Sequence, residues 1–117
     1  IKKYKKIIKR KLSFQEDNEN IYGEDSIISS VSKNIEVVFH VRFHIMPNIN
    51  LIETNKKRSI ILKTKNNNIW TFNANRDLVV EESIIVDNND TTNTNQIVIK
   101  GITKNNREKI KWSLIKT

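Results

Sequence analysis

The residues best placed to do chemistry are two histidines and an arginine at alternating positions. His40, Arg42 and His44 share one face of an expected strand, where alternate residues lie about 7 Å apart. His40 and His44 are four residues apart, so on a strand they are too far from each other to bind one metal ion directly without a bulge. His44 beside a carboxylate of a neighbouring strand, such as Asp25 or Glu24, would form half of a zinc or calcium site. Spacing alone favours an ordinary, half-exposed polar face.

Other residue types argue against a complete active site within this chain. Two glycines cannot build a nucleotide-binding loop, and the absence of cysteine excludes a thiol nucleophile and a thiolate metal site. Glu81 and Glu82 are adjacent, so on a strand they point to opposite faces and cannot act as a paired acid and base. The sequence therefore predicts no catalytic residue.

Length and charge narrow the class of protein. A chain of 117 residues makes one domain, and it has no apolar run long enough to span a membrane. The net charge of +8 indicates an anionic partner. However, 20 Ile, 17 Asn and 16 Lys suggest AT-rich coding, and only 5 Arg accompany the lysines. Because arginine is the better reader of phosphates and bases, we do not expect a specific nucleic-acid surface.

The segments that carry these residues show the sequence pattern of β-strands. Apolar and polar residues alternate through Val37–Met46, and Ser59–Thr64 with Ile69–Asn73 form a hairpin around Asn-rich residues 65–68. Further strands are expected at residues 8–14, 21–29, 78–86, 96–100 and 109–114, with a polar run at 87–95 between two of them. About eight or more short strands predict an all-β, antiparallel β-sandwich of jelly-roll-like type.

The sequence also bears on three details of this fold: one hairpin, two aromatic residues and one glutamate. The basic residues 1–12 and the acidic stretch from Gln15 to Asp25 would pair across a hairpin as neighbouring strands, although two solvated faces that neutralise each other are the favoured interpretation. Trp70 and Phe72 are interpreted as core, with stacking on sugar rings as the alternative. Glu82 shares a face with apolar residues, so either a bulge rotates it outward or it is buried with a partner.

The order of several short motifs resembles a known family. The motifs are GED at 23–25, VRFHIMP at 41–47, IIL at 60–62, IWTFNA at 69–74, LVVEESIIV at 78–86, TNQIVIKG at 94–101 and IKWSL at 110–114. In this order they are similar to the C-terminal β-sandwich region of bacterial heparinase II/III-like proteins, in the type common among alphaproteobacteria. The resemblance runs from about Lys9 to Leu114.

This resemblance implies a polysaccharide lyase that acts on acidic glycans by β-elimination. Its partner would be an N-terminal α-helical toroid carrying the catalytic Tyr, and its location would be the cell envelope or periplasm. Related lyases hold a structural metal in the sandwich through His and Asp. Here Ile8 and Met46 stand where two histidines are expected, so the resemblance leaves Asp25 and His44 as the candidate metal ligands, with zinc as the possible ion.

Together these observations predict that residues 1–117 are a single sandwich domain from the C-terminal part of a longer lyase-like protein. Its expected role is structural and substrate-supporting, without a complete active site. The alternative is a free-standing module that binds carbohydrate or polyanions through its basic rows and Trp70.

Overall fold

The computed structural model describes residues 6–15, 19–29, 37–103 and 107–117. Within these ranges the chain forms nine strands and no helix, and therefore no helix that could cross a membrane. The strands are β1 (Lys6–Gln15), β2 (Asn20–Ser29), β3 (Val37–Ile45), β4 (Asn50–Glu53), β5 (Ser59–Lys63), β6 (Ile69–Ala74), β7 (Leu78–Asp87), β8 (Asp90–Thr103) and β9 (Arg107–Lys116).

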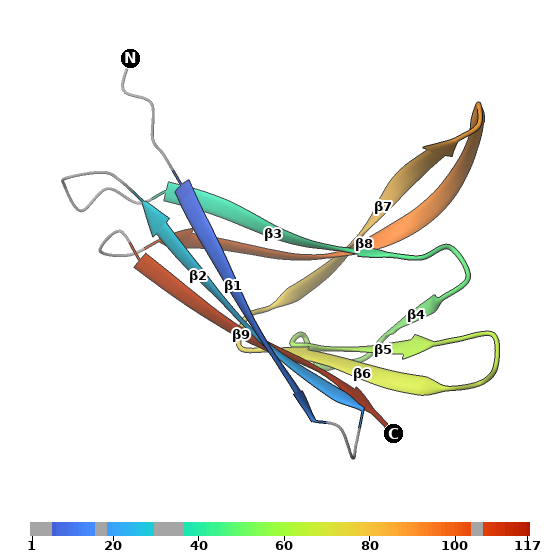
Figure 1. Ribbon diagram of the computed structural model, residues 1–117, viewed down its shortest axis with the longest axis horizontal. Coiled ribbons are helices and arrows are strands. Elements are labelled where there is room, and N and C mark those ends of the chain that lie inside the picture. The colour runs from blue at the N-terminus through green and yellow to red at the C-terminus, as the bar shows by residue number, and fades with distance from the viewer. Residues whose placement is uncertain (1–5, 16–18, 30–36, 104–106) are drawn as a thin grey trace.

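The strands form two antiparallel sheets that face each other (Figure 1). The large sheet has the order β1-β2-β9-β6-β5-β4, and the small sheet has the order β3-β8-β7. All pairings are antiparallel, which confirms the expected β-sandwich. Because the small sheet has half as many strands, it leaves part of the large sheet's inner face uncovered. Ile8, Leu12 and Phe14 alternate along this face of edge strand β1, and their side chains are exposed.

The core lies between the inner faces of the two sheets. Phe43 of β3 reaches across to Phe72 of β6 and Trp112 of β9, with ring centroids 4.9 and 5.1 Å away. Aromatic pairs at these separations add to the stabilisation from burial itself. Phe72 and Trp112 therefore belong to the core, as the sequence predicted. The buried aliphatic residues around them are Ile27, Val41, Ile60, Leu62, Ile97, Ile99 and Ile110.

Two local predictions are confirmed by the strand register. β5 and β6 form a hairpin whose turn contains Asn67 at a φ of 61°, the left-handed conformation that asparagine tolerates well. The basic and acidic segments pair as β1 and β2, which places Arg10 opposite Asp25 and Lys11 opposite Glu24.

The polar run at residues 87–95 is not a long connection. β7 and β8 continue into it as a hairpin that turns at Asn88 and Asn89, with φ values of 48° and 69°. Figure 1 shows the end of this hairpin projecting away from the rest of the molecule. Strands need apolar residues only where a second sheet covers them, so the β8 half of this arm can consist of polar residues.

Glu82 is neither rotated outward by a bulge nor buried with a partner, because it lies in the arm that extends beyond the core. The β7–β8 register runs without interruption from Leu78 to Asp87, so no bulge rotates Glu82 outward. Its side chain is nevertheless exposed, because the inner face of the arm at this point has left the core. Ile84 and Val86 on the same face are 64% and 71% exposed.

The close packing of Gly23 against Trp112 gives a test of the fold. A Cβ atom at Gly23 would overlap the indole ring of Trp112. We expect Gly23→Ala to lower the free energy of unfolding by about 1–3 kcal/mol, the usual cost of overpacking a core. Urea denaturation measures this change. Ser26→Ala, at an outward position of the same strand, is the matched control and should change stability by less than about 0.5 kcal/mol. Equal stability of the two variants would contradict the packing of the sheets.

Candidate functional site

Asp25 lies where a carboxylate is costly to place. Alternation along β2 turns Gly23, Asp25 and Ile27 toward the core, and the side chain of Asp25 is 0% exposed. A buried carboxylate destabilises a fold unless partners satisfy its charge and its hydrogen-bonding capacity. The groups that surround Asp25 are therefore the first place to look for a site.

Arg10, on the adjacent edge strand β1, supplies the positive charge that pairs with Asp25. Its Nε donates to Oδ1 of Asp25 and its Nη2 donates to Oδ2, both at 2.8 Å. This two-pronged geometry is the strongest form of the arginine–carboxylate pair. The indole Nε1 of Trp112 also lies 3.4 Å from Oδ1. The hydrogen bond with Asp25, and secondarily its charge, raise the pKa of Arg10 against the opposing effect of partial burial.

The guanidinium group of Arg10 also contacts the opposite sheet. Its Cζ atom lies 4.8 Å from the ring centroid of Phe43 in β3 and 5.6 Å from the ring centroid of Trp112 in β9. Both distances are within the range of a cation–π interaction. One arginine thus neutralises Asp25 and packs against aromatic rings of both sheets. We call Arg10, Asp25, Phe43 and Trp112 the arginine clamp.

The structure does not bring the two candidate metal ligands together. Phe43 points into the core, so its neighbour His44 points to the outer face of the small sheet, where it is exposed. Asp25 lies inside the sandwich, and both of its oxygens accept hydrogen bonds from Arg10. Among the described residues, no three His, Cys, Asp or Glu side chains gather as a metal-binding group. The donors present therefore do not fit a zinc ion, and Arg10 provides the positive charge beside Asp25.

The outer face of the small sheet is a polar surface with its own ion pairs. Glu81 of β7 accepts a hydrogen bond from Arg42 of β3 at 2.8 Å and lies 3.0 Å from the Nζ of Lys100 of β8. These hydrogen bonds lower the pKa of Glu81. His40 and His44 lie on this same face and are exposed.

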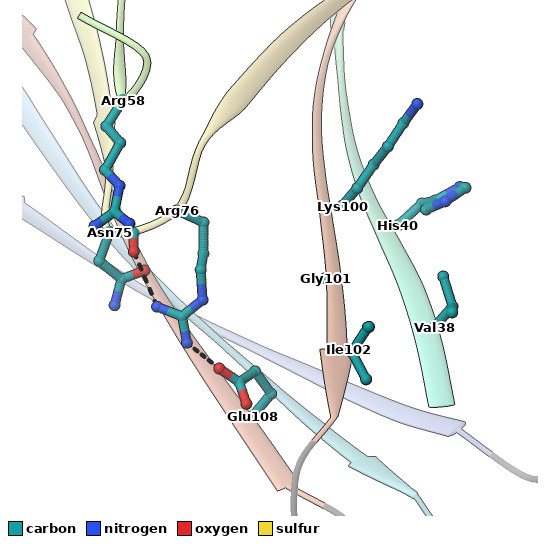
Figure 2. Close-up of a pocket in the computed structure, with 9 residues that line it drawn as sticks. All are labelled: Val38, His40, Arg58, Asn75, Arg76, Lys100, Gly101, Ile102 and Glu108. Atoms are coloured by element: carbon teal, nitrogen blue, oxygen red, sulfur yellow. Dashed lines mark hydrogen bonds and ion pairs between the residues drawn. The ribbon is translucent and has the colours of Figure 1, made fainter. Parts of the chain in front are cut away.

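A hollow of about 710 Å³ lies beside β8 at the point where β7 leaves it (Figure 2). One side carries Arg58, Arg76 and Glu108, whereas His40 and Lys100 point away from these groups. Arg76 pairs with Glu108 and donates a further hydrogen bond to a backbone carbonyl at 2.9 Å.

The other charged groups around this hollow are also engaged. Arg58 lies 3.2 Å from Asp77, and Lys100 pairs with Glu81. A carboxylate held by a guanidinium or ammonium group must give up that pairing to accept a proton, so it is a poor general base. The ionisable groups of this hollow mainly hold neighbouring strands and loops together.

The clamp was only partly visible in the sequence. Charge patterning predicts the β1–β2 pairing, and the GED motif singles out Asp25. Sequence reasoning missed Arg10 as the partner of Asp25. The signal that could have found it was its position on the same face as Ile8 and Leu12, where a lone cation among apolar residues requires an inward-facing anion.

The fold and the clamp define the class of protein as an antiparallel β-sandwich domain in which a partly exposed arginine pairs with a buried carboxylate. The family model for the C-terminal region of heparinase II/III-like proteins matches residues 2–113. The chain therefore belongs to the heparinase II/III-like family and represents its C-terminal domain. No curated protein and no solved structure gives a significant match.

The clamp predicts the metal content of the protein. Purified protein should contain no stoichiometric zinc, because Arg10 already occupies both oxygens of Asp25 and His44 lies elsewhere. Elemental analysis and melting temperatures with and without a chelator measure this. Stoichiometric zinc whose removal lowers the melting temperature would overturn this assignment.

The ion pairs of Glu81 predict a dependence of stability on pH. Because its folded-state pKa is lowered, its stabilising contribution is complete above the unfolded value of about 4.5 and is lost as the pH falls through the folded value. Glu81→Gln should therefore melt below the wild type at neutral pH, and the gap should narrow in acid. Thermal melts across this range measure the gap. Glu82→Gln is the control, since Glu82 has no ion pair among the described residues. A constant gap for Glu81→Gln would contradict the pairing.

Proposed function

We propose that this domain is the sandwich portion of a polysaccharide lyase that cleaves acidic glycans by β-elimination. In that reaction a base removes the proton α to a uronic carboxylate, and a cationic or hydrogen-bonding group stabilises the anion that forms. An acid then protonates the leaving oxygen. Within such an enzyme the role we assign to this domain is structural and substrate-supporting.

One observation carries this assignment of roles. The charged groups that line the hollow of about 710 Å³ form the ion pairs Arg58–Asp77, Arg76–Glu108 and Lys100–Glu81. An acid–base pair that acts on substrate needs groups free to exchange protons with it. Here these groups fix the positions of strands and loops. This use of charge supports a scaffold rather than a catalytic centre.

The catalytic residues would then belong to an N-terminal helical toroid of the parent protein, working in the cell envelope or periplasm. The net charge of +8 supports an acidic polysaccharide as the substrate of the whole enzyme. A positive supporting domain concentrates a polyanion near the catalytic domain without contributing to the chemical step.

The absorbance of unsaturated uronate products tests this proposal. Residues 1–117 alone should form no product from heparin, heparan sulfate or alginate, whereas the parent protein should form it from at least one of these. Product formation by residues 1–117 would overturn the supporting role. A parent protein inactive on all three would overturn the assignment to acidic glycans.

A further inference from the structure

The outer face of the large sheet carries an exposed aromatic ring among small polar residues. Because Gly23 and Asp25 face the core, Tyr22 faces outward, and 37% of its surface is exposed. Its cross-strand neighbours are Ser13 on β1 and Ser113 on β9. In the part of the chain that the structure describes, the Tyr22 hydroxyl has no protein hydrogen-bond partner. The ring and its hydroxyl are therefore available to a ligand.

Two lysines flank this ring one row further along the sheet. Glu24 lies between Lys11 on β1 and Lys111 on β9 in the strand register. The backbones of these two lysines are two strand spacings apart, roughly 9–10 Å. Glu24 is paired with Lys109 at 3.0 Å, and this hydrogen bond, with the charges of the nearby lysines, lowers the pKa of Glu24. Neither Lys11 nor Lys111 makes a salt bridge among the described residues.

The charge of this surface is therefore positive. Lys9, Lys11, Arg107, Lys109 and Lys111 point outward on the described parts of these strands against Glu24, which leaves four positive charges. All four lysine side chains are exposed. A cationic surface of this kind attracts anions, and its attraction is screened over about 8 Å at physiological ionic strength.

A hollow of about 300 Å³ lies on each side of Tyr22. The first is lined by Lys11, Ser13, Tyr22 and Glu24, among others. The second is lined by Tyr22, Asn73, Asn75, Lys111 and Ser113, among others. Asn75 is fixed there, because its backbone N–H donates to the carbonyl of Lys111 at 3.0 Å and its Oδ1 accepts from the N–H of Lys111 at 3.1 Å. Lys111 belongs to both hollows.

We propose that this face binds a uronate-containing oligosaccharide, with one sugar ring packed on Tyr22 and carboxylates paired with Lys11 and Lys111. A sugar ring presents an apolar face and a rim of hydroxyls, which suit an aromatic ring surrounded by Ser13, Ser113 and Asn73. A nucleic acid fits less well, because the surface offers one aromatic ring rather than a series of stacking platforms. The site lies on the opposite face of β2 from Asp25, and it shares only Trp112, which also lines both hollows, with the arginine clamp.

Calorimetric titration with tetragalacturonate tests the site, and it does not depend on lyase activity. Maltotetraose is the neutral sugar, and a short single-stranded DNA is the competing anion. Lys11→Gln and Lys111→Gln should each weaken tetragalacturonate binding about two- to five-fold, as expected for exposed charges. Tyr22→Leu should weaken it at least as much, whereas Tyr22→Phe, which keeps the ring, should bind within about two-fold of the wild type.

Lys63→Gln is the matched control, because Lys63 lies on the same outer face in β5, beyond β6. It should leave affinity unchanged, and thermal melts should show that all variants remain folded. Equal losses from all three lysine variants, with no effect of Tyr22→Leu, would overturn the site in favour of non-specific charge attraction. Tighter binding of DNA through the same residues, or no binding of tetragalacturonate, would also overturn it. A lyase-inactive parent protein with intact tetragalacturonate binding would refute only the proposed function.

Discussion

The need to neutralise one buried carboxylate shapes this domain. Asp25 has no exposed surface, so its charge must be met by a cation within hydrogen-bonding distance. Arg10 meets it only because the β1–β2 register puts the two residues directly opposite each other. A slip of one residue would turn Arg10 to solvent and leave the carboxylate unpaired. The ion pair and the register of the edge strand therefore depend on each other.

The same pair connects the two sheets. Trp112 reaches Asp25 because Gly23 leaves room for its indole ring, and Phe43 of the small sheet lies over the guanidinium of Arg10. Phe43 also contacts Phe72 and Trp112 of the large sheet. Loss of the ion pair would therefore disturb the aromatic centre of the core as well as the edge of the large sheet.

Sequence patterns predicted most of the strands because alternation directly reports the face to which a side chain points. They gave the β5–β6 turn, the pairing of β1 with β2 and the inward orientation of Trp112. They could not show how far the opposite sheet extends, so the β7–β8 arm, exposed Glu82 and the short strand β4 were missed. Whether the opposite sheet covers a strand depends on the whole fold rather than on the local sequence.

The candidate site was predicted less well for a related reason. The motif order identified the family and pointed to Asp25, but the partner of a buried charge depends on strand register and on the opposite sheet. His44 shares a motif with Phe43, yet alternation sends the two side chains to opposite faces of β3. Trp70 lies partly buried against the core, and the ring that we propose to bind sugar is instead that of Tyr22 on the outer face. The inner face of the sandwich thus serves stability, and the recognition site that we propose lies on its outer face.

A double-mutant cycle of Arg10→Gln and Asp25→Asn, followed by chemical denaturation, tests the central claim most directly. If the two side chains form the pair that organises the core, each single change removes one partner, and the double change costs less than the sum of the two. The coupling energy should be at least about 1 kcal/mol, in the range measured for residues in contact. Additive effects, within about 0.3–0.5 kcal/mol, would show that the two residues do not interact and would contradict the account.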